Sequence, residues 1–263
     1  MFSSFGTKIT IMMGARIGGN DNSRLPECLL ALSTHAESKN RYEVLIKMDD
    51  DDPGLGSLKA TIESFSDRVN IRYIVTPRGR GYADLHKAYL DLMLMASPLS
   101  EMFWVLSDDV MVAGHHWDRK LLDCAAKSPD GVFVITPTAK VDYSMMAQHE
   151  ALNTMENYPV WSRGWVGICG GFGYTFSTDG WTNLICWKLV REYGLDPRLL
   201  PEPLQSPAGA VPSILMARTR GAQDVPGSER WNTARKEMFD KVLSAQVQSL
   251  LDYTVHAIAR AKA

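Results

Sequence analysis

The stretch Phe103-Trp-Val-Leu-Ser-Asp-Asp-Val110 places two adjacent carboxylates directly after an apolar run. Residues 102–106 carry no charge, so we expect a short buried strand there. Because successive side chains of a strand point to opposite faces, Asp108 and Asp109 have different tasks unless the chain turns at this point. One of them can hold a hard divalent cation, and the other can contact a ligand or a metal-bound water. The alternative is a solvated turn in which an aspartate caps the next helix.

Strand and helix patterns alternate on both sides of this stretch. Short apolar runs predict strands, and apolar residues at helical spacing predict helices between them. The expected strands are 8–13, 43–48, 71–75, 102–106 and 132–135, and the expected helices are 24–37, 57–65, 82–96 and 116–126. This order predicts an α/β fold with a mainly parallel sheet that helices cover on both faces. Ligands of such sheets bind outside the carboxyl ends of the strands.

The residues that follow the expected strands are rich in charge and glycine. They are Gly14, Ala15 and Arg16 after the first strand, Asp49 to Asp52 after the second, Arg78 to Gly81 after the third, and Asp108 and Asp109 after the fourth. Loops at the carboxyl ends of parallel strands open at one edge of the sheet. We therefore expect acidic, basic and glycine-rich segments to lie together.

Two of these loops allow both a functional and a structural interpretation. Four adjacent carboxylates at 49–52 repel one another, so at least one should have a partner; the loop is either a solvated turn or a hydrogen-bonding edge for a nucleobase or ribose. Arg78 and Arg80, with glycines and a following helix, form either a basic turn or an anion cradle. The segment from Gly79 to Asp84 lacks the last glycine of the dinucleotide fingerprint, which argues against a Rossmann dehydrogenase.

The alternation ends near residue 136, and the second half is less regular. The run from Gly164 to Tyr174 holds too many glycines for a regular helix. Five prolines in 196–212 predict a constrained loop. A long amphipathic helix is expected at 231–258, and such a helix is more typical of a packed cap or a dimer face than of a membrane anchor.

Asp179 precedes another expected helix, at 181–193. It is either the N-cap of that helix or the general base of a pocket walled by aromatic side chains. The aromatic residues nearby, which either stack on sugar rings or belong to the core, are Trp161, Trp165, Phe172, Tyr174 and Trp181.

Composition excludes several classes of protein. The chain has 263 residues, and 45% of them are hydrophobic, as in globular proteins and not in disordered ones. A net charge of −2 argues against a dedicated nucleic-acid binder. The four cysteines are far apart and predict reduced core thiols in a cytoplasmic protein. We see no signal peptide and no apolar run of about 18 residues, so no transmembrane segment is expected, while peripheral contact with a membrane stays open.

Taken in order, these motifs resemble those of the GT-A nucleotide-sugar glycosyltransferases, in particular the inverting family 2. The resemblance covers residues 8–195. It implies a GT-A-like, Rossmann-like fold with an irregular acceptor-side region and a C-terminal helix. Residues 1–140 would bind the nucleotide sugar, and residues 141–263 would form the acceptor-side half with a helical extension, within one continuous domain.

The resemblance also implies roles for single residues on the nucleotide side. It places Gly14, Ala15 and Arg16 in the base-binding loop, has Asp49 or Asp50 read the nucleobase, and brings Arg78, Arg80 and Gly81 near the nucleotide.

Further roles follow for the metal ion and the catalytic base. The strand end Ser107-Asp-Asp109 is similar to a DXD motif, with Ser107 in place of the first aspartate. Asp109 would ligate Mn²⁺ or Mg²⁺, and Asp108 would contact the donor. Asp179 would be the base, and Thr178 stands before it where the family usually has glutamate.

The resemblance implies metal-dependent transfer of a sugar from a nucleoside-diphosphate sugar to an acceptor hydroxyl, with inversion. The acceptor is open (glycan, lipid-linked group or another hydroxyl compound), no nucleic-acid partner is expected, and the C-terminal helix offers a surface for a homodimer. One alternative is a sugar-phosphate nucleotidyltransferase, whose glycine-rich basic loop after the first strand is matched in part by Gly14-Ala-Arg-Ile-Gly-Gly19. The other is a non-catalytic nucleotide- or carbohydrate-binding domain.

Overall fold

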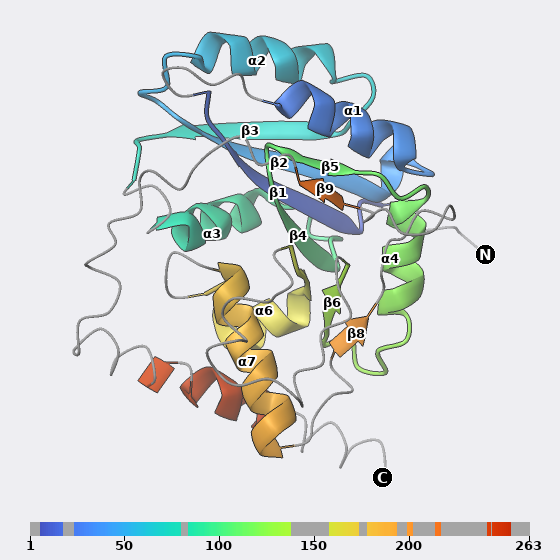
Figure 1. The fold of residues 1–263 in the computed structure, drawn as a ribbon, viewed down its shortest axis with the longest axis vertical. Coiled ribbons are helices and arrows are strands. Elements are labelled where there is room, and N and C mark those ends of the chain that lie inside the picture. Colours follow the sequence, from blue (N-terminus) through green and yellow to red (C-terminus); the bar gives the residue numbers. More distant parts are fainter. Residues whose placement is uncertain are drawn as a thin grey trace.

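The computed structural model of the chain describes residues 6–17, 24–79, 84–137, 158–173, 178–193, 199–201, 214–216, 241–242 and 244–253. Within these residues a seven-stranded sheet carries helices on both faces, and a two-stranded sheet lies beside it (Figure 1). None of the described helices is both long enough and apolar enough to cross a bilayer.

Four neighbouring parallel strands form the N-terminal part of the larger sheet. They are β1 (Ile9–Ala15), β2 (Tyr42–Asp49), β3 (Ile71–Thr76) and β4 (Met102–Ser107), in the spatial order β3-β2-β1-β4. β1 lies in the middle and pairs with β2 along its whole length and with β4 from Ile9 to Gly14. The runs of apolar residues in β1, β2 and β4 are buried on both faces, as expected for parallel strands between two helical layers.

The remaining strands extend the sheet beyond β4. β7 (Val160–Ser162) is antiparallel to β4 and to β6 (Val134–Thr136), and β6 is parallel to β8 (Leu199–Pro201). The sheet is therefore mixed but mainly parallel, which confirms the α/β prediction. β5 (Val110–Val112) and β9 (Ile214–Met216) form the two-stranded sheet.

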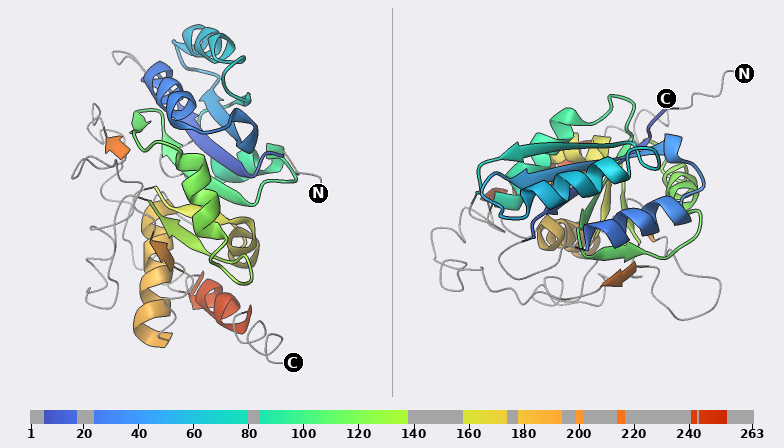
Figure 2. Two further views of the ribbon diagram at one scale, coloured as in Figure 1. Left: turned by 90° about the vertical axis from the view of Figure 1, so that its right-hand side faces the viewer. Right: turned by 90° about the horizontal axis from the view of Figure 1, so that it is seen from above.

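Two helical layers enclose the larger sheet. α1 (Leu25–His35), α2 (Leu55–Ser64) and α4 (Trp117–Ala125) pack in one core, and α3 (Leu85–Met95), α6 (Arg163–Cys169) and α7 (Thr178–Tyr193) pack in the other. Alternate residues of β1 serve the two sides, since Ile11 and Met13 belong to the first core and Met12 to the second. The left view of Figure 2 shows α1 and α2 at the top and α7 at the bottom.

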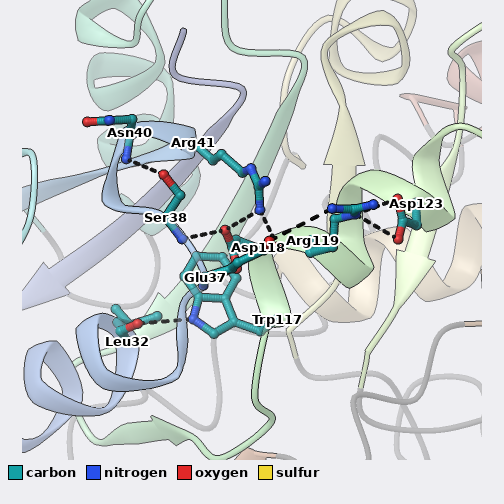
Figure 3. A network of polar contacts seen from close by, with 9 residues as sticks. All are labelled: Leu32, Glu37, Ser38, Asn40, Arg41, Trp117, Asp118, Arg119 and Asp123. Carbon is teal, nitrogen blue, oxygen red and sulfur yellow. Dashed lines mark hydrogen bonds and ion pairs between the residues drawn. The ribbon is translucent and has the colours of Figure 1, made fainter. Parts of the chain in front are cut away.

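A buried carboxylate ties α4 to the end of α1 (Figure 3). Asp118, in the first turn of α4, is fully buried and accepts hydrogen bonds from the backbone N–H groups of Glu37 at 2.7 Å and Ser38 at 3.1 Å. It also pairs with Arg41 Nη1 at 3.2 Å. Three donors compensate for the burial of this charge, so the segment between α1 and β2 is fixed at the amino ends of the strands.

The expectation that glycines exclude a helix in the run 164–174 is wrong for its first part, where α6 forms. The hydroxyl of Ser162 caps this helix by accepting a hydrogen bond from the backbone N–H of Trp165 at 3.0 Å, and the Trp165 side chain is buried. The helix ends at Gly170, whose φ of +72° lies in the left-handed region that favours glycine. Capping and burial outweigh the low helix propensity of its two glycines.

Short strands of the second half also differ from the expectations. The proline-rich segment 196–212 contains β8, and the other residues of that segment lie outside the described ones. Pro201 ends β8 at the edge of the described sheet, where a missing N–H is tolerated. β5, β7 and β9 have three residues each, which is too short for a periodic pattern. α7 begins at Thr178, three residues earlier than the expected 181.

The C-terminal helix expected at 231–258 is described in 244–253 as a helix that packs on the second core. Val247 and Leu250 are buried there, and Gln246 accepts a hydrogen bond from an indole N–H of α7 at 2.6 Å. This part is a packed cap, because its buried side chains contact the protein's own core and are not open to a second copy.

The aromatic side chains around α6 and α7 belong to the core. The exposed fractions of Trp161, Trp165, Phe172 and Trp181 are 1–2%, and the rings of Trp161 and Phe172 make an edge contact at 5.4 Å between centroids. These four rings are therefore not open to a sugar in this structure. Tyr174 lies outside the described residues.

We expect Gly164→Ala to destabilise the protein, because the added Cβ would lie 2.9 Å from Val132 Cγ2 and 3.4 Å from the carbonyl oxygen of Gly131. Gly167 of the same helix has open space around that position, so Gly167→Ala is the matched control and should raise the free energy of unfolding by about 0.5–1 kcal/mol. In urea unfolding, the free energy of unfolding of Gly164→Ala should be lower than that of the wild type by about 1 kcal/mol or more. Equal stabilisation by both alanines would contradict the close packing.

Candidate functional site

The carboxyl ends of β1, β2 and β4 lie side by side because the three strands are paired in register. Gly14 of β1 is opposite both Lys47 of β2 and Ser107 of β4. On the outer side of β2, Asp49 is opposite Thr76 of β3. The loops after the first four parallel strands therefore leave the sheet at one edge, where ligands of such sheets bind.

Arg16 joins three of these loops. Its Nη1 pairs with Asp49 Oδ2 at 2.9 Å and with Asp51 Oδ1 at 2.7 Å, and its backbone N–H donates to Asp108 Oδ2 at 3.4 Å. Partial burial lowers the pKa of Arg16, but the bonds to Asp51 and Asp49 outweigh this effect, so that its pKa is raised above the ordinary value. Arg16 is therefore a permanent cation in the middle of the acidic edge.

Asp49 and Asp51 are the two aspartates after β2 that form ion pairs with basic side chains. Asp49 uses both carboxylate oxygens, since Lys47 Nζ contacts Oδ1 while Arg16 contacts Oδ2. The hydrogen bond from Arg16 lowers the pKa of Asp51, and the charge of Arg78 lowers it further. Both carboxylates are thus engaged in the structure as it stands.

Asp52 is the structural member of the same loop. It is 5% exposed, and its carboxylate accepts hydrogen bonds from the backbone N–H groups of Ile17 and Gly54, both at 2.8 Å. Gly54 approaches Ile17 so closely that a Cβ there would lie 2.5 Å from Ile17 Cδ1. The loops after β1 and β2 are therefore locked together.

Asp50 offers an open carboxylate on a fixed backbone. Its backbone N–H donates to the carbonyl of Thr76 at 3.0 Å, which anchors the main chain beside β3. Its side chain is exposed, and among the residues that the structure describes no hydrogen bond or ion pair engages it. Such a carboxylate can accept an N–H or O–H group of a ligand.

Asp108 and Asp109 form a turn between β4 and β5, so the chain does change direction where the two carboxylates lie. Asp108 is 6% exposed and receives the backbone N–H of Arg16, whereas Asp109 is half-buried and has no hydrogen bond or ion pair within the described part of the chain. Behind the turn, the thiol of Cys28 donates to the carbonyl of Asp108 at 3.0 Å. Burial, together with the charges of both aspartates, raises the pKa of Cys28, so the thiol keeps its proton.

The oxygen donors of this turn fit a Mg²⁺- or Mn²⁺-type ion. The described residues contain no group of three or more His, Cys, Asp or Glu side chains that would form a complete metal site. Magnesium bound with a phosphate substrate needs only one or two protein carboxylates, because phosphate oxygens and water supply the other ligands. Asp109, with Asp108 beside it, meets this requirement.

The structure brings together most of the predicted site residues. Those at the shared edge are Gly14, Ala15, Arg16, Asp49, Asp50, Asp108 and Asp109. Arg78 follows β3, is exposed and lies near enough to Asp51 to lower its pKa. Arg80 and Gly81 lie outside the described residues, and of Asp179 only its place as the second residue of α7 is described.

Three residues that shape the site were not singled out from the sequence. Lys47 carried a signal, since it is the only cation in a mostly apolar strand that begins with Tyr42-Glu43 and ends in Asp49. Asp52 was hidden beside three identical residues, Asp49 to Asp51. Cys28 carried no signal, because its contact with Asp108 joins positions 80 residues apart.

No protein-family model and no curated protein matches the chain. Among solved structures, TarS of S. aureus aligns with a TM-score of 0.53 at 13% identity, over 76% of this chain and 36% of TarS. A fragment of TarS in complex with UDP aligns with a TM-score of 0.52 at 13% identity, over 76% of this chain and 59% of the fragment. The mannosyltransferase PcManGT of Pyrobaculum calidifontis, in complex with GDP-Man and Mn²⁺, aligns with a TM-score of 0.50 at 13% identity, over 76% of this chain and 56% of PcManGT.

These likenesses show the fold alone, and that fold is of the GT-A type, as the sequence resemblance implied. The chain spans just over half of the TarS fragment and of PcManGT, and 36% of the longer TarS chain.

We expect Asp52→Ala to lower the free energy of unfolding by about 2–4 kcal/mol, because two backbone N–H groups lose a buried, charged acceptor. Asp50→Ala is the matched control, since it removes an exposed carboxylate from the same loop and should change stability by less than about 0.5 kcal/mol. Urea unfolding compares the two. Similar values for both variants would show that Asp52 does not lock the loops.

Proposed function

We propose that the protein is a metal-dependent glycosyltransferase that moves a sugar from a nucleoside-diphosphate sugar to an acceptor hydroxyl. The observation that carries this proposal is the meeting of Arg16, Asp50 and Asp109 at the carboxyl edge of a GT-A fold. The solved relatives contain UDP in one case and GDP-Man with Mn²⁺ in another, which supports a nucleotide sugar as the class of donor.

On the base side, Asp50 would accept a hydrogen bond from an N–H or O–H group of the nucleobase or ribose. Asp49 is the alternative, but both of its oxygens are held by cations, so it would have to give up an ion pair to take this role. The backbone of Gly14 and Ala15, at the end of β1, would border the base.

On the phosphate side, Arg16 and Arg78 would face the diphosphate, and Arg80 and Gly81 of the same loop as Arg78 would complete its binding. Guanidinium groups match phosphate geometry, and glycine leaves backbone amides accessible to anions. Arg16 would supply fixed positive charge where the leaving diphosphate gains negative charge.

Asp109 would hold the Mn²⁺ or Mg²⁺ ion, and Asp108 beside it would contact the donor. Such an ion supplies a Lewis acid for the departing diphosphate. The role of this chain is to fix the carboxylate at the end of β4, on a turn that Arg16 contacts from one side.

Asp179 would be the base on the acceptor side. It lies in the first turn of α7. It would take the proton of the acceptor hydroxyl as that oxygen bonds to the anomeric carbon and the bond to the diphosphate breaks. A single displacement of this kind inverts the anomeric configuration.

A thermal-shift panel with UDP, GDP and their sugar conjugates, each with and without Mn²⁺, tests the proposal. A ligand present at 100 times its dissociation constant should stabilise the folded protein by about 2.7 kcal/mol. No shift with any of these ligands would overturn the proposal. Pyrophosphate release from a nucleoside triphosphate and a sugar phosphate would instead identify a nucleotidyltransferase, and binding without donor turnover would identify a non-catalytic domain.

We expect Asp109→Ala to reduce sugar transfer or donor hydrolysis at least about 100-fold and to abolish the Mn²⁺ dependence of nucleotide binding, because the carboxylate that would hold the ion is lost. Asp123→Ala on α4 is the control, since that side chain is 65% exposed and, among the described residues, pairs only with Arg119. Steady-state rates across a Mn²⁺ titration measure the effect. Full activity of Asp109→Ala would move the metal site elsewhere.

For Asp179→Asn we expect donor binding to stay within about twofold of the wild type while transfer falls by about 10²–10⁴-fold, because an amide cannot take the acceptor proton. Calorimetric binding of the nucleotide, measured beside the transfer rate, separates the two effects. Unchanged turnover would exclude Asp179 as the base.

A further inference from the structure

The turn that carries Asp109 is held from behind by α1. Cys28, the fourth residue of that helix, is fully buried, and its thiol donates to the carbonyl of Asp108 at 3.0 Å. We propose that Cys28 is a positioning residue, whose hydrogen bond fixes the turn and thereby the direction of the Asp109 carboxylate. The link to a metal ion rests on the proposed function, whereas the fixing of the turn does not.

Two of the contacts that hold Asp108 come from different parts of the fold. The backbone N–H of Arg16 bonds to its carboxylate, and the Cys28 thiol bonds to its main-chain carbonyl. With both the side chain and the main chain engaged, the next residue, Asp109, projects from a turn that has little freedom. A ligand carboxylate needs such support, since a metal site tolerates displacements of only about 0.5 Å.

The strands on either side of the turn are fixed, which leaves the turn itself as the movable part. β4 is buried in the sheet, and β5 packs against α1 through Val110 and Val112, which share a core with Leu25 and Leu29. Without the thiol, the carbonyl of Asp108 would lose its partner on α1. The helix would then support the strand but not the turn.

A different role for Cys28 is to fill space in the interior, as buried cysteines commonly do. The two roles predict opposite results for two substitutions. Cys28→Val fills the space but cannot donate, and Cys28→Ser donates but leaves space. Cys186→Val is the matched control, because Cys186 is also fully buried but lies in α7, in the other core.

The first measurement is independent of any activity. Backbone ¹⁵N relaxation and the carbonyl shift of Asp108 are recorded for the wild type and the three variants. In Cys28→Val we expect the order parameters of Asp108 and Asp109 to fall below about 0.6 while those of β4 stay near about 0.85. Cys28→Ser should keep the order parameters of the wild type, and Cys186→Val should leave the turn unchanged. Cys28→Ala replaces the valine variant if that variant does not fold.

The second measurement is the affinity for Mn²⁺ in the presence of UDP or GDP. The EPR signal of unbound Mn²⁺ reports how much of the ion is bound. Cys28→Val should weaken Mn²⁺ binding about 2- to 10-fold, the effect of one hydrogen bond, while nucleotide binding without metal stays the same. Cys28→Ser should restore Mn²⁺ binding.

The outcomes separate this proposal from the proposed function. An unchanged turn in Cys28→Val would overturn the positioning role whatever the metal data show. A loosened turn with unaltered Mn²⁺ affinity would overturn the claim that Cys28 sets the direction of the Asp109 carboxylate. A loosened turn in a protein whose wild type binds no Mn²⁺ with either nucleotide would support the positioning of the turn and count against the glycosyltransferase.

Discussion

The parallel hydrogen bonding of β1 to both β2 and β4 is the constraint on which the site depends. Gly14 is opposite Lys47 on one side and Ser107 on the other, so the three following loops leave the sheet at the same level. The register is fixed by burial, because a shift of one residue would exchange the sides of Ile11 and Met12, which belong to different cores. Packing deep in the sheet thus sets the distances between charges at its edge.

Identical aspartates acquire different properties at that edge because their partners differ. Asp52 accepts backbone N–H groups, Asp51 is paired with Arg16, and Asp50 is open to solvent. The aspartates at 49–52 and 108–109 outnumber the cations Arg16, Lys47 and Arg78, so the donor proposed above would approach a region with an excess of negative charge. A divalent cation would reduce that repulsion. On the proposed function, donor and cation would therefore bind together.

The first half of the fold could be predicted from sequence because its elements are long and periodic. The strands and helices from β1 to α4 agree with the expected ranges within a few residues, except for the short β5 and a 3₁₀ helix at Lys39–Arg41, which were not expected. α6 could not, since the cap at Ser162 and the packing of Trp165 are tertiary effects that override glycine content. The location of the site followed from topology. The different roles of the neighbouring aspartates could not be predicted, because they depend on contacts with Arg16, which is more than 30 residues away in sequence.

The contact between Gly54 and Ile17 joins the loops after β1 and β2 into one steric unit. A chimera that imported the β1 loop from another protein of this fold would have to import the β2 loop as well, or the incoming side chain would collide with the turn before α2. Over evolution, a residue larger than glycine at 54 should be found only where position 17 has become smaller. The two segments are therefore expected to diverge in step, although 36 residues separate them along the chain.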